Sequence, residues 1–147
     1  MRKHKFLTTF LLLMLILSSL SACGNQGSPN LKDIHVELIP AQEVLPTGEF
    51  TTYTVKITDK KGKPFDPDKV YLYLNMEMMN HPTEGTMERV SEGIYELSLP
   101  LAMAGEWYAE ITLSVGEETR KYEGFTVQAE GDMFMEYMKG YHHDQAK

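Results

Sequence analysis

The sequence predicts an all-β domain, built as a sandwich or barrel of about seven short antiparallel strands. Three observations support this prediction. Short runs alternate between apolar and polar residues, or are rich in β-branched and aromatic residues, as half-buried strands are. Clusters of Gly, Pro, Asp and Ser interrupt these runs roughly every 8–12 residues. No long helical pattern separates them as a crossover between parallel strands would require, which disfavours a parallel α/β fold.

The first strands are expected at residues 34–39, 50–58 and 70–78. The first alternates in hydrophobicity and is stopped by Pro40, which cannot donate to a ladder. The second, FTTYTVKIT, is rich in β-branched and aromatic residues, and the turn cluster DKKGKP follows it. The third alternates without a break. Its two expected faces carry Leu72, Leu74, Met76 and Met78 on one side, and Tyr71, Tyr73, Asn75 and Glu77 on the other.

The remaining strands are expected at residues 86–90, 94–99, 106–115 and 120–128. Ser91-Glu92-Gly93 separates the first two as a hairpin loop. The third alternates and places Trp107, Ala109, Ile111, Leu113 and Val115 on one face. The turn Gly116-Glu117-Glu118 leads into the last. Residues 34–129 are therefore predicted to form one domain, long enough to bury one core.

The N-terminus has the three parts of a secretory signal peptide. Basic residues precede the apolar stretch FLTTFLLLMLILSSL, and small residues follow it before Cys23. LSAC also resembles the bacterial lipobox, in which the cysteine is acylated and becomes the first residue. We therefore expect a signal peptide at 1–22, a lipid on Cys23 and a position on the extracytoplasmic face of the cell membrane. The alternative is an uncleaved anchor helix and a chance cysteine.

Charge and cysteine content restrict the partners. Residues 1–22 carry three basic and no acidic residues, so their removal takes the formal net charge from −7 to −10. Such an acidic chain is a poor ligand for nucleic acid or anionic lipid surfaces. Cys23 is the only cysteine, so no internal disulfide can form. Two or more acyl chains on it would give firm membrane attachment.

Two segments flank the expected domain. Residues 23–33 are the lipidated cysteine and a small, polar stretch that indicates a flexible tether. Residues 130–147 form a tail rich in Met and His, for which one or two helical turns before Gly140, or disorder, are both open. If the tail were helical, Met135, Met138 and His142 would share one face.

Methionine and histidine are the most informative residues for function. Eight methionines remain after Cys23, and six of them cluster with histidines, three in NMEMMNHP and three in the tail. Thioether sulfur is a soft, neutral ligand that suits Cu(I), and imidazole extends a site to Cu(II). The candidate ligands are Met76, Met78, Met79, His81 and Met103, with Met135, Met138, His142 and His143 as a second, mobile capture site.

Each of these residues also has a structural interpretation. Methionine fills cores well, and Met76 and Met78 share the expected face of Leu72 and Leu74. Met103 fits either core packing or a ligand role. Met87 is expected to be structural, and His35 to lie on a solvated strand face. No cysteine nucleophile, HExxH helix or phosphate-binding Gly-rich loop is present, so we expect no enzyme.

The order of three motifs resembles the YtkA-like domain family, which is related to FixH-like proteins. The motifs are NMEMMNHP at 75–82, GIYELSLPL at 93–101 and MAGEWYAEITL at 103–113. The resemblance spans roughly residues 34–128 and implies an immunoglobulin-like sandwich. It also implies copper handling, since FixH-like members are linked with assembly of copper-containing respiratory oxidases. The adjacent Met78 and Met79 and the Met/His tail depart from the family pattern.

We therefore expect a membrane-tethered lipoprotein that holds copper, Cu(I) rather than Cu(II), or delivers it to a copper-dependent oxidase or a copper transporter. The alternative is an immunoglobulin-like interaction module that binds a membrane or envelope protein. In that case the methionines serve packing alone.

Overall fold

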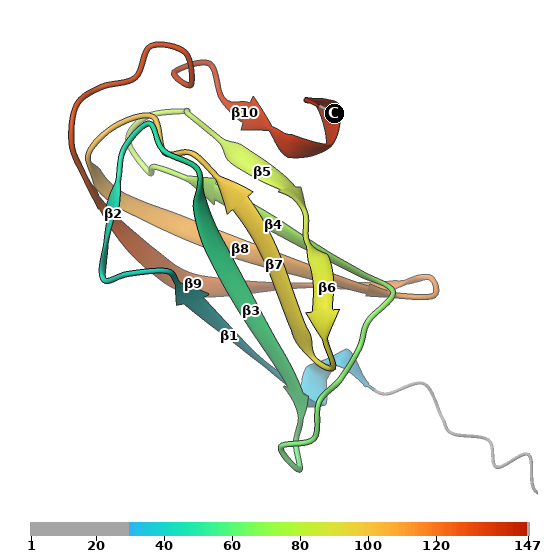
Figure 1. The fold of residues 1–147 in the computed structure, drawn as a ribbon. Helices are drawn as coiled ribbons and strands as arrows, with labels where there is room; N and C mark the ends of the chain where they lie inside the picture. The colour runs from blue at the N-terminus through green and yellow to red at the C-terminus, as the bar shows by residue number, and fades with distance from the viewer. Residues whose placement is uncertain (1–29, 147) are drawn as a thin grey trace, which may run out of the picture.

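The computed structural model describes residues 30–146, which fold into two β-sheets packed face to face (Figure 1). This confirms the predicted all-β sandwich. The predicted signal peptide and Cys23 lie outside the described residues. Within the described range, no helix is long and apolar enough to cross a membrane.

The smaller sheet has four antiparallel strands in the order β1-β3-β7-β6. Their bounds are Ile34–Pro40 for β1, Thr51–Asp59 for β3, Ile94–Leu99 for β7 and Glu88–Ser91 for β6. The larger sheet has six strands in the order β10-β5-β4-β8-β9-β2. Their bounds are Tyr141–His142 for β10, Thr83–Thr86 for β5, Lys69–Asn75 for β4, Gly105–Val115 for β8, Glu118–Glu130 for β9 and Val44–Pro46 for β2.

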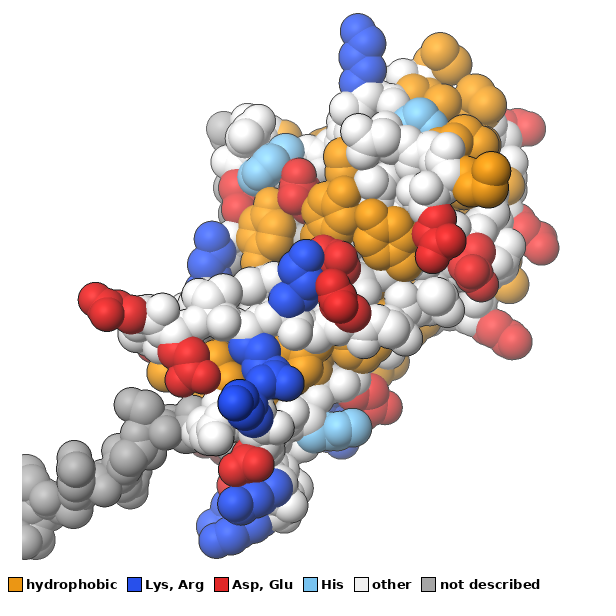
Figure 2. All heavy atoms as spheres, turned by 180° about the vertical axis from the view of Figure 1, so that it is seen from behind, with side chains coloured by type: hydrophobic (Ala, Val, Ile, Leu, Met, Phe, Trp, Pro, Cys, Tyr) orange, Lys and Arg blue, Asp and Glu red, His pale blue; other side chains and the backbone are white. Residues whose placement is uncertain are grey.

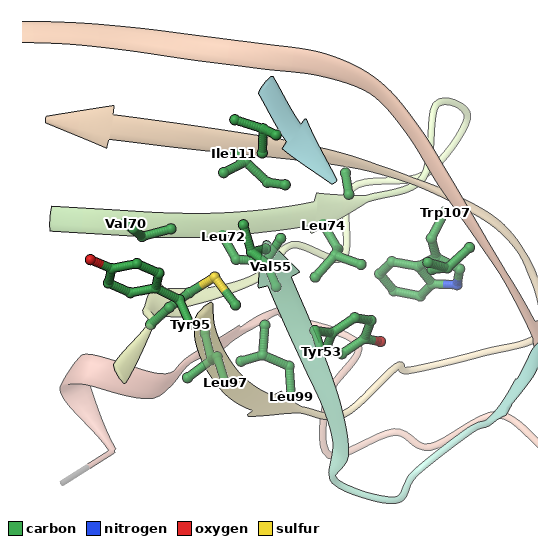
Figure 3. Packing of buried hydrophobic residues seen from close by; sticks show 14 of the residues in the cluster. Tyr53, Val55, Val70, Leu72, Leu74, Tyr95, Leu97, Leu99, Trp107 and Ile111 are labelled. Carbon is green, nitrogen blue, oxygen red and sulfur yellow. The ribbon is translucent and has the colours of Figure 1, made fainter. Parts of the chain in front are cut away.

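The core forms where alternate residues of the two sheets face each other (Figure 3). Along β8 the predicted face is confirmed, with Trp107, Ala109, Ile111 and Leu113 all buried. The long strands β3, β4 and β7 supply most of the remaining core residues: Tyr53, Val55, Ile57, Val70, Leu72, Leu74, Tyr95, Leu97 and Leu99. Met87 is buried and His35 is exposed, as expected.

The strand predicted at residues 70–78 is too long. β4 ends at Asn75, and Met78 beyond it is 93% exposed, so Met78 does not continue the buried face of Leu72 and Leu74. The reason lies in the side chain of Asn75. Its Oδ1 accepts hydrogen bonds from the backbone N–H groups of Met76 and His81, each at 2.9 Å. An Asn side chain that takes backbone donors in this way competes with the sheet ladder.

The strand predicted at residues 86–90 is in fact two strands in different sheets. β5 lies in the larger sheet and β6 in the smaller one, and the chain crosses between them at Met87. The backbone N–H of Met87 donates to the carbonyl of Val70 at 2.9 Å, while its side chain is buried between the sheets.

The predicted tether is too long at its C-terminal end. Leu31–Asp33 forms a 3-10 turn capped by Asn30, and Leu31 is fully buried. The hydroxyl of Tyr122 on β9 donates to the carbonyl of Leu31. An apolar side chain that gains full burial in this way belongs to the folded domain, because burial of a leucine stabilises it by about 2 kcal/mol.

Candidate functional site

Three segments meet at one end of the sandwich, and we call them together the methionine end. They are residues 76–82 between β4 and β5, residues 100–104 between β7 and β8, and residues 131–140 of the tail (upper left in Figure 1). Backbone hydrogen bonds join them. Phe134 N donates to the carbonyl of Ala102 at 2.7 Å, and Tyr141 N donates to the carbonyl of Pro82 at 2.8 Å. The tail is therefore docked on the sandwich.

Asn75 shapes the first of these segments. It is only 5% exposed. Besides its two backbone donors, its Nδ2 donates to Tyr73 Oη at 2.8 Å and to Asn80 Oδ1 at 3.0 Å. Since Met76 and His81 bind the same oxygen, the segment closes on itself. Sequence reasoning missed this residue; the available signal was an Asn at a strand end, where its side chain often organises a turn.

His81 has one satisfied and one bare ring nitrogen. Its Nδ1 lies 2.5 Å from the backbone carbonyl oxygen of Met138. A carbonyl only accepts, so Nδ1 carries the proton and donates it. Nε2 therefore presents a lone pair, and this atom is buried with no hydrogen-bond partner within residues 30–146. Metal-binding histidines commonly have this arrangement, with one nitrogen donating to a carbonyl and the other left for the metal.

The methionines of this end differ in exposure. Met76 and Met103 are partly buried and pack against the core. The Met76 methyl lies against Gly105, so close that a Cβ there would sit 2.7 Å from it, and the carbonyl of Met103 accepts from Trp107 Nε1 at 3.1 Å. Met79 is exposed, and Met135 and Met78 are more so. Met76 and Met103 are thus held by the fold, whereas Met78, Met79 and Met135 project into solvent.

An open hollow of about 220 Å³ lies beside Met76. Its lining contains two thioethers and two carboxylates, from the residues Met76, Glu77, Met78, Glu106, Tyr108 and Thr126. His81 does not line this hollow. The arrangement gives Met76 access to solvent beside acidic side chains, which attract cations.

His142 and His143 lie elsewhere, along the edge of the larger sheet. β10 pairs with β5, and His142 Nε2 lies 3.3 Å from the hydroxyl of Tyr71. That hydroxyl donates to Glu84 at 3.0 Å, and burial, followed by Glu84, raises the pKa of Tyr71. Since the Tyr71 proton goes to Glu84, His142 Nε2 is the donor toward Tyr71. The Nδ1 atoms of both histidines are buried without a hydrogen-bond partner in the described part of the chain.

The tail does not form the helical face that would align Met135, Met138 and His142. Residues 135–139 form turns, and Gly140, with φ of 97°, redirects the chain into β10. A Cβ on Gly140 would lie 2.8 Å from the carbonyl oxygen of Pro82, so this approach requires glycine. The carbonyl of Met138 lies against the ring of His81, whereas His142 pairs with Glu84 across β10 and β5. The tail candidates are therefore split between the methionine end and the edge of the larger sheet.

The chemistry of the donor set favours a soft metal. Across residues 30–146, no group of three or more His, Cys, Asp or Glu side chains is placed to hold a metal ion. What the methionine end does offer is thioethers and one bare imidazole nitrogen. These are neutral, soft to intermediate ligands, which suit Cu(I) and have little use for Mg²⁺ or Ca²⁺.

Comparison with known proteins identifies the fold. No family model matches the chain, and no curated protein matches it. Three chains of known structure match, among them the filamin domain of Lin-41, with a TM-score of 0.50 and 16% sequence identity. The match covers 70% of this chain and 97% of that one. The chain therefore has an immunoglobulin-like β-sandwich fold, as predicted, and at this identity the likeness shows the fold alone.

Proposed function

We propose that this protein binds copper at the methionine end, as Cu(I) rather than Cu(II), and holds or delivers it outside the cytoplasmic membrane. The observation that carries the proposal is the state of His81, whose Nε2 is buried and bare while Nδ1 donates to a carbonyl. An unpaired buried nitrogen costs free energy unless something binds it. A metal ion taken up on Nε2 would remove that cost.

Met76 and Met103 are the thioethers that we assign to the same site. Both are held against the core near Gly105 and Trp107, so little ordering is needed before they bind. Thioether ligands need no deprotonation and form no disulfides, so they suit an oxidising compartment outside the cell. The exposed Met78, Met79 and Met135 are assigned a weaker role in first capture of the ion.

The position of the site fits delivery to another protein. The described chain begins near the lower right of Figure 1, and the methionine end lies at the upper left. In the view from behind, apolar side chains gather at the corresponding upper right end (Figure 2). A lipid on Cys23 would tie the opposite end of the sandwich to the membrane. The site would then face a partner such as a copper-dependent oxidase or a copper transporter.

An anaerobic Cu(I) titration of residues 24–147 against a chromophoric chelator tests the proposal. We expect His81→Ala to weaken binding by at least about 100-fold, since loss of an outer-shell partner alone typically costs 10–100-fold. Met76→Leu and Met103→Leu should weaken it too, because leucine keeps the packing and removes the sulfur.

Two substitutions serve as matched controls. His35→Ala removes an exposed imidazole on β1, and Met87→Leu removes a thioether buried between the sheets. Both should bind Cu(I) like the wild type. If the wild-type chain binds no more tightly than the variant with His81, Met76 and Met103 all replaced, the copper proposal is wrong.

An interaction module is the second candidate, and an aromatic cluster favours it. Phe50 is 52% exposed and makes edge-to-face contacts with Tyr137 and Tyr141 of the tail, with ring centroids 6.1 and 5.3 Å away. Exposed aromatic groups of this kind are common anchors in protein interfaces. If Phe50→Ala abolishes the cellular function while His81→Ala leaves it intact, this candidate replaces the copper site.

A further inference from the structure

We infer that the C-terminal strap, residues 131–146, is the element that positions His81 for metal binding. When the strap is docked on the sandwich, it holds the His81 ring with Nδ1 protonated and Nε2 without a hydrogen-bond partner among the described residues. When the strap is undocked, neither ring nitrogen has a hydrogen bond to it. Metal affinity and strap docking are then coupled. This inference rests on the proposed copper site, but its first part concerns the metal-free protein and can be tested without copper.

Two glycines of the sandwich leave the space that the strap occupies. A Cβ on Gly48, which has a φ of 75°, would overlap the ring of Phe134. A Cβ on Gly85 in β5 would lie 2.6 Å from the Cβ of His143, closer than such atoms approach. The absence of side chains at these two positions lets the strap lie directly on the backbone of the sandwich.

Polar contacts hold the strap along its length. Near its start, Thr47 Oγ1 donates to the carbonyl of Asp132 at 2.7 Å. Near its end, the Asp144 carboxylate accepts from Thr86 N at 3.0 Å and from Thr86 Oγ1 at 2.8 Å. β10 pairs in parallel with β5 between these points. The strap is therefore fixed at both ends, and Met138 lies on the span between them.

His81 depends on this span. The carbonyl of Met138 is the acceptor for Nδ1, and it is the ring's hydrogen-bond partner in the described structure. A neutral imidazole carries its proton on either nitrogen, and the bond made by one nitrogen decides which. If the strap is displaced, the carbonyl of Met138 no longer accepts from Nδ1. The tautomer of His81 with its proton on Nδ1 then loses the hydrogen bond that favours it. The strap thus acts on His81 through a backbone atom, which no substitution of the Met138 side chain removes.

Coupling follows from linkage. If strap docking favours the metal-binding form of His81, metal binding must favour the docked strap by the same factor. Loss of a hydrogen bond to the second nitrogen of a metal-bound histidine commonly lowers affinity by about 10–100-fold. We expect a change of that size when the strap is displaced.

The first experiment uses the metal-free chain, residues 24–147, and ¹⁵N chemical shifts of the imidazole nitrogens. In the wild type, His81 should show one tautomer, with Nδ1 protonated. Gly85→Ala, which displaces His143, should give mixed tautomers, and so should removal of residues 131–147. Met138→Leu should keep the wild-type spectrum, because the carbonyl remains. A single unchanged tautomer in both strap variants would refute the positioning role.

The second experiment measures Cu(I) affinity and amide hydrogen exchange. Asp144→Ala should weaken binding, and Cu(I) should slow exchange of the Tyr141 amide, which donates to Pro82. Asp59→Ala is the matched control, since this carboxylate holds the backbone N–H groups of Lys61 and Lys63 in a distant turn. Equal affinity in all strap variants would refute the coupling. Absence of Cu(I) binding in the wild type, with the tautomer result as expected, would refute the copper proposal and leave the positioning of His81 standing.

Discussion

Two residues of this domain, Tyr53 and His81, each have a buried polar atom without a hydrogen-bond partner within residues 30–146, and the consequences differ. Tyr53 in β3 is fully buried, and its hydroxyl has no hydrogen-bond partner in the described range. Burial raises the pKa of this hydroxyl, so the group stays neutral. His81 Nε2 is also unpaired, but it lies at the methionine end of the molecule, where other candidate ligands lie. The unpaired Tyr53 hydroxyl costs stability, whereas we propose that His81 Nε2 binds a metal ion.

The Tyr53 hydroxyl gives a prediction at this scale. Tyr53→Phe removes an unpaired buried hydroxyl and keeps the aromatic ring that fills the core. It should therefore raise the free energy of unfolding by about 1 kcal/mol. Urea unfolding followed by tryptophan fluorescence measures the change, since Trp107 is the only tryptophan in the chain.

Tyr95→Phe is the matched comparison. Tyr95 is also buried, but its hydroxyl lies 3.3 Å from both Asp66 Oδ1 and the carbonyl of Pro67. Its loss should lower stability by about 1 kcal/mol. Should both substitutions change stability in the same direction, hydrogen bonding would not explain the difference between the two hydroxyls.

Residue identities predicted burial well and contacts poorly. The alternating pattern correctly placed Trp107 in the core and His35 in solvent. It placed Asn75 on the strand face opposite Leu72 and did not predict its burial, because it assumed that the strand continued past this residue. The bond between His81 and Met138 joins residues 57 positions apart, and no local pattern contains it. The candidate ligands could be named from their chemistry, but their grouping required the fold.

Elements were predicted where they are long and missed where they are short. The strands β3, β4, β7, β8 and β9 carry enough alternating residues to be recognised. β2 and β10 have three and two residues, and each pairs in parallel with a strand distant in sequence. Such short strands form because they can pair with the edge of an existing sheet. Their formation therefore depends on tertiary contacts and not on the periodicity of their own sequence.

The 3-10 turn before β1 supports a prediction at the scale of the element. Leu31→Ala should lower the free energy of unfolding by about 2–5 kcal/mol, the usual cost of truncating a fully buried leucine. Lys32→Ala, at an exposed position in the same turn, should change it by less than about 0.5 kcal/mol. Urea denaturation of both variants checks this. If Leu31→Ala were as stable as Lys32→Ala, the turn would contribute nothing to the fold and would belong to the flexible tether, as the sequence predicted.

The whole molecule has two different ends. The described chain begins at the end that carries the turn Leu31–Asp33, and the methionine end lies across the sandwich from it (Figure 1). Between them the two sheets share one hydrophobic core. A chain attached through its N-terminus would therefore present its methionines to the surrounding compartment.

Attachment to the membrane is the prediction that belongs to this scale. Cys23→Ser should prevent acylation and move the protein from the membrane fraction to the soluble exported fraction, as fractionation and immunoblotting would show. Cu(I) affinity of the released protein should stay at the wild-type value, because the proposed ligands Met76, His81 and Met103 all lie within residues 30–146 and do not include Cys23. Retention of the Cys23→Ser protein in the membrane fraction would instead support an uncleaved anchor at residues 6–20. Mass spectrometry of the wild-type N-terminus separates the two cases, since only cleavage and acylation give a lipid-modified chain that starts at Cys23.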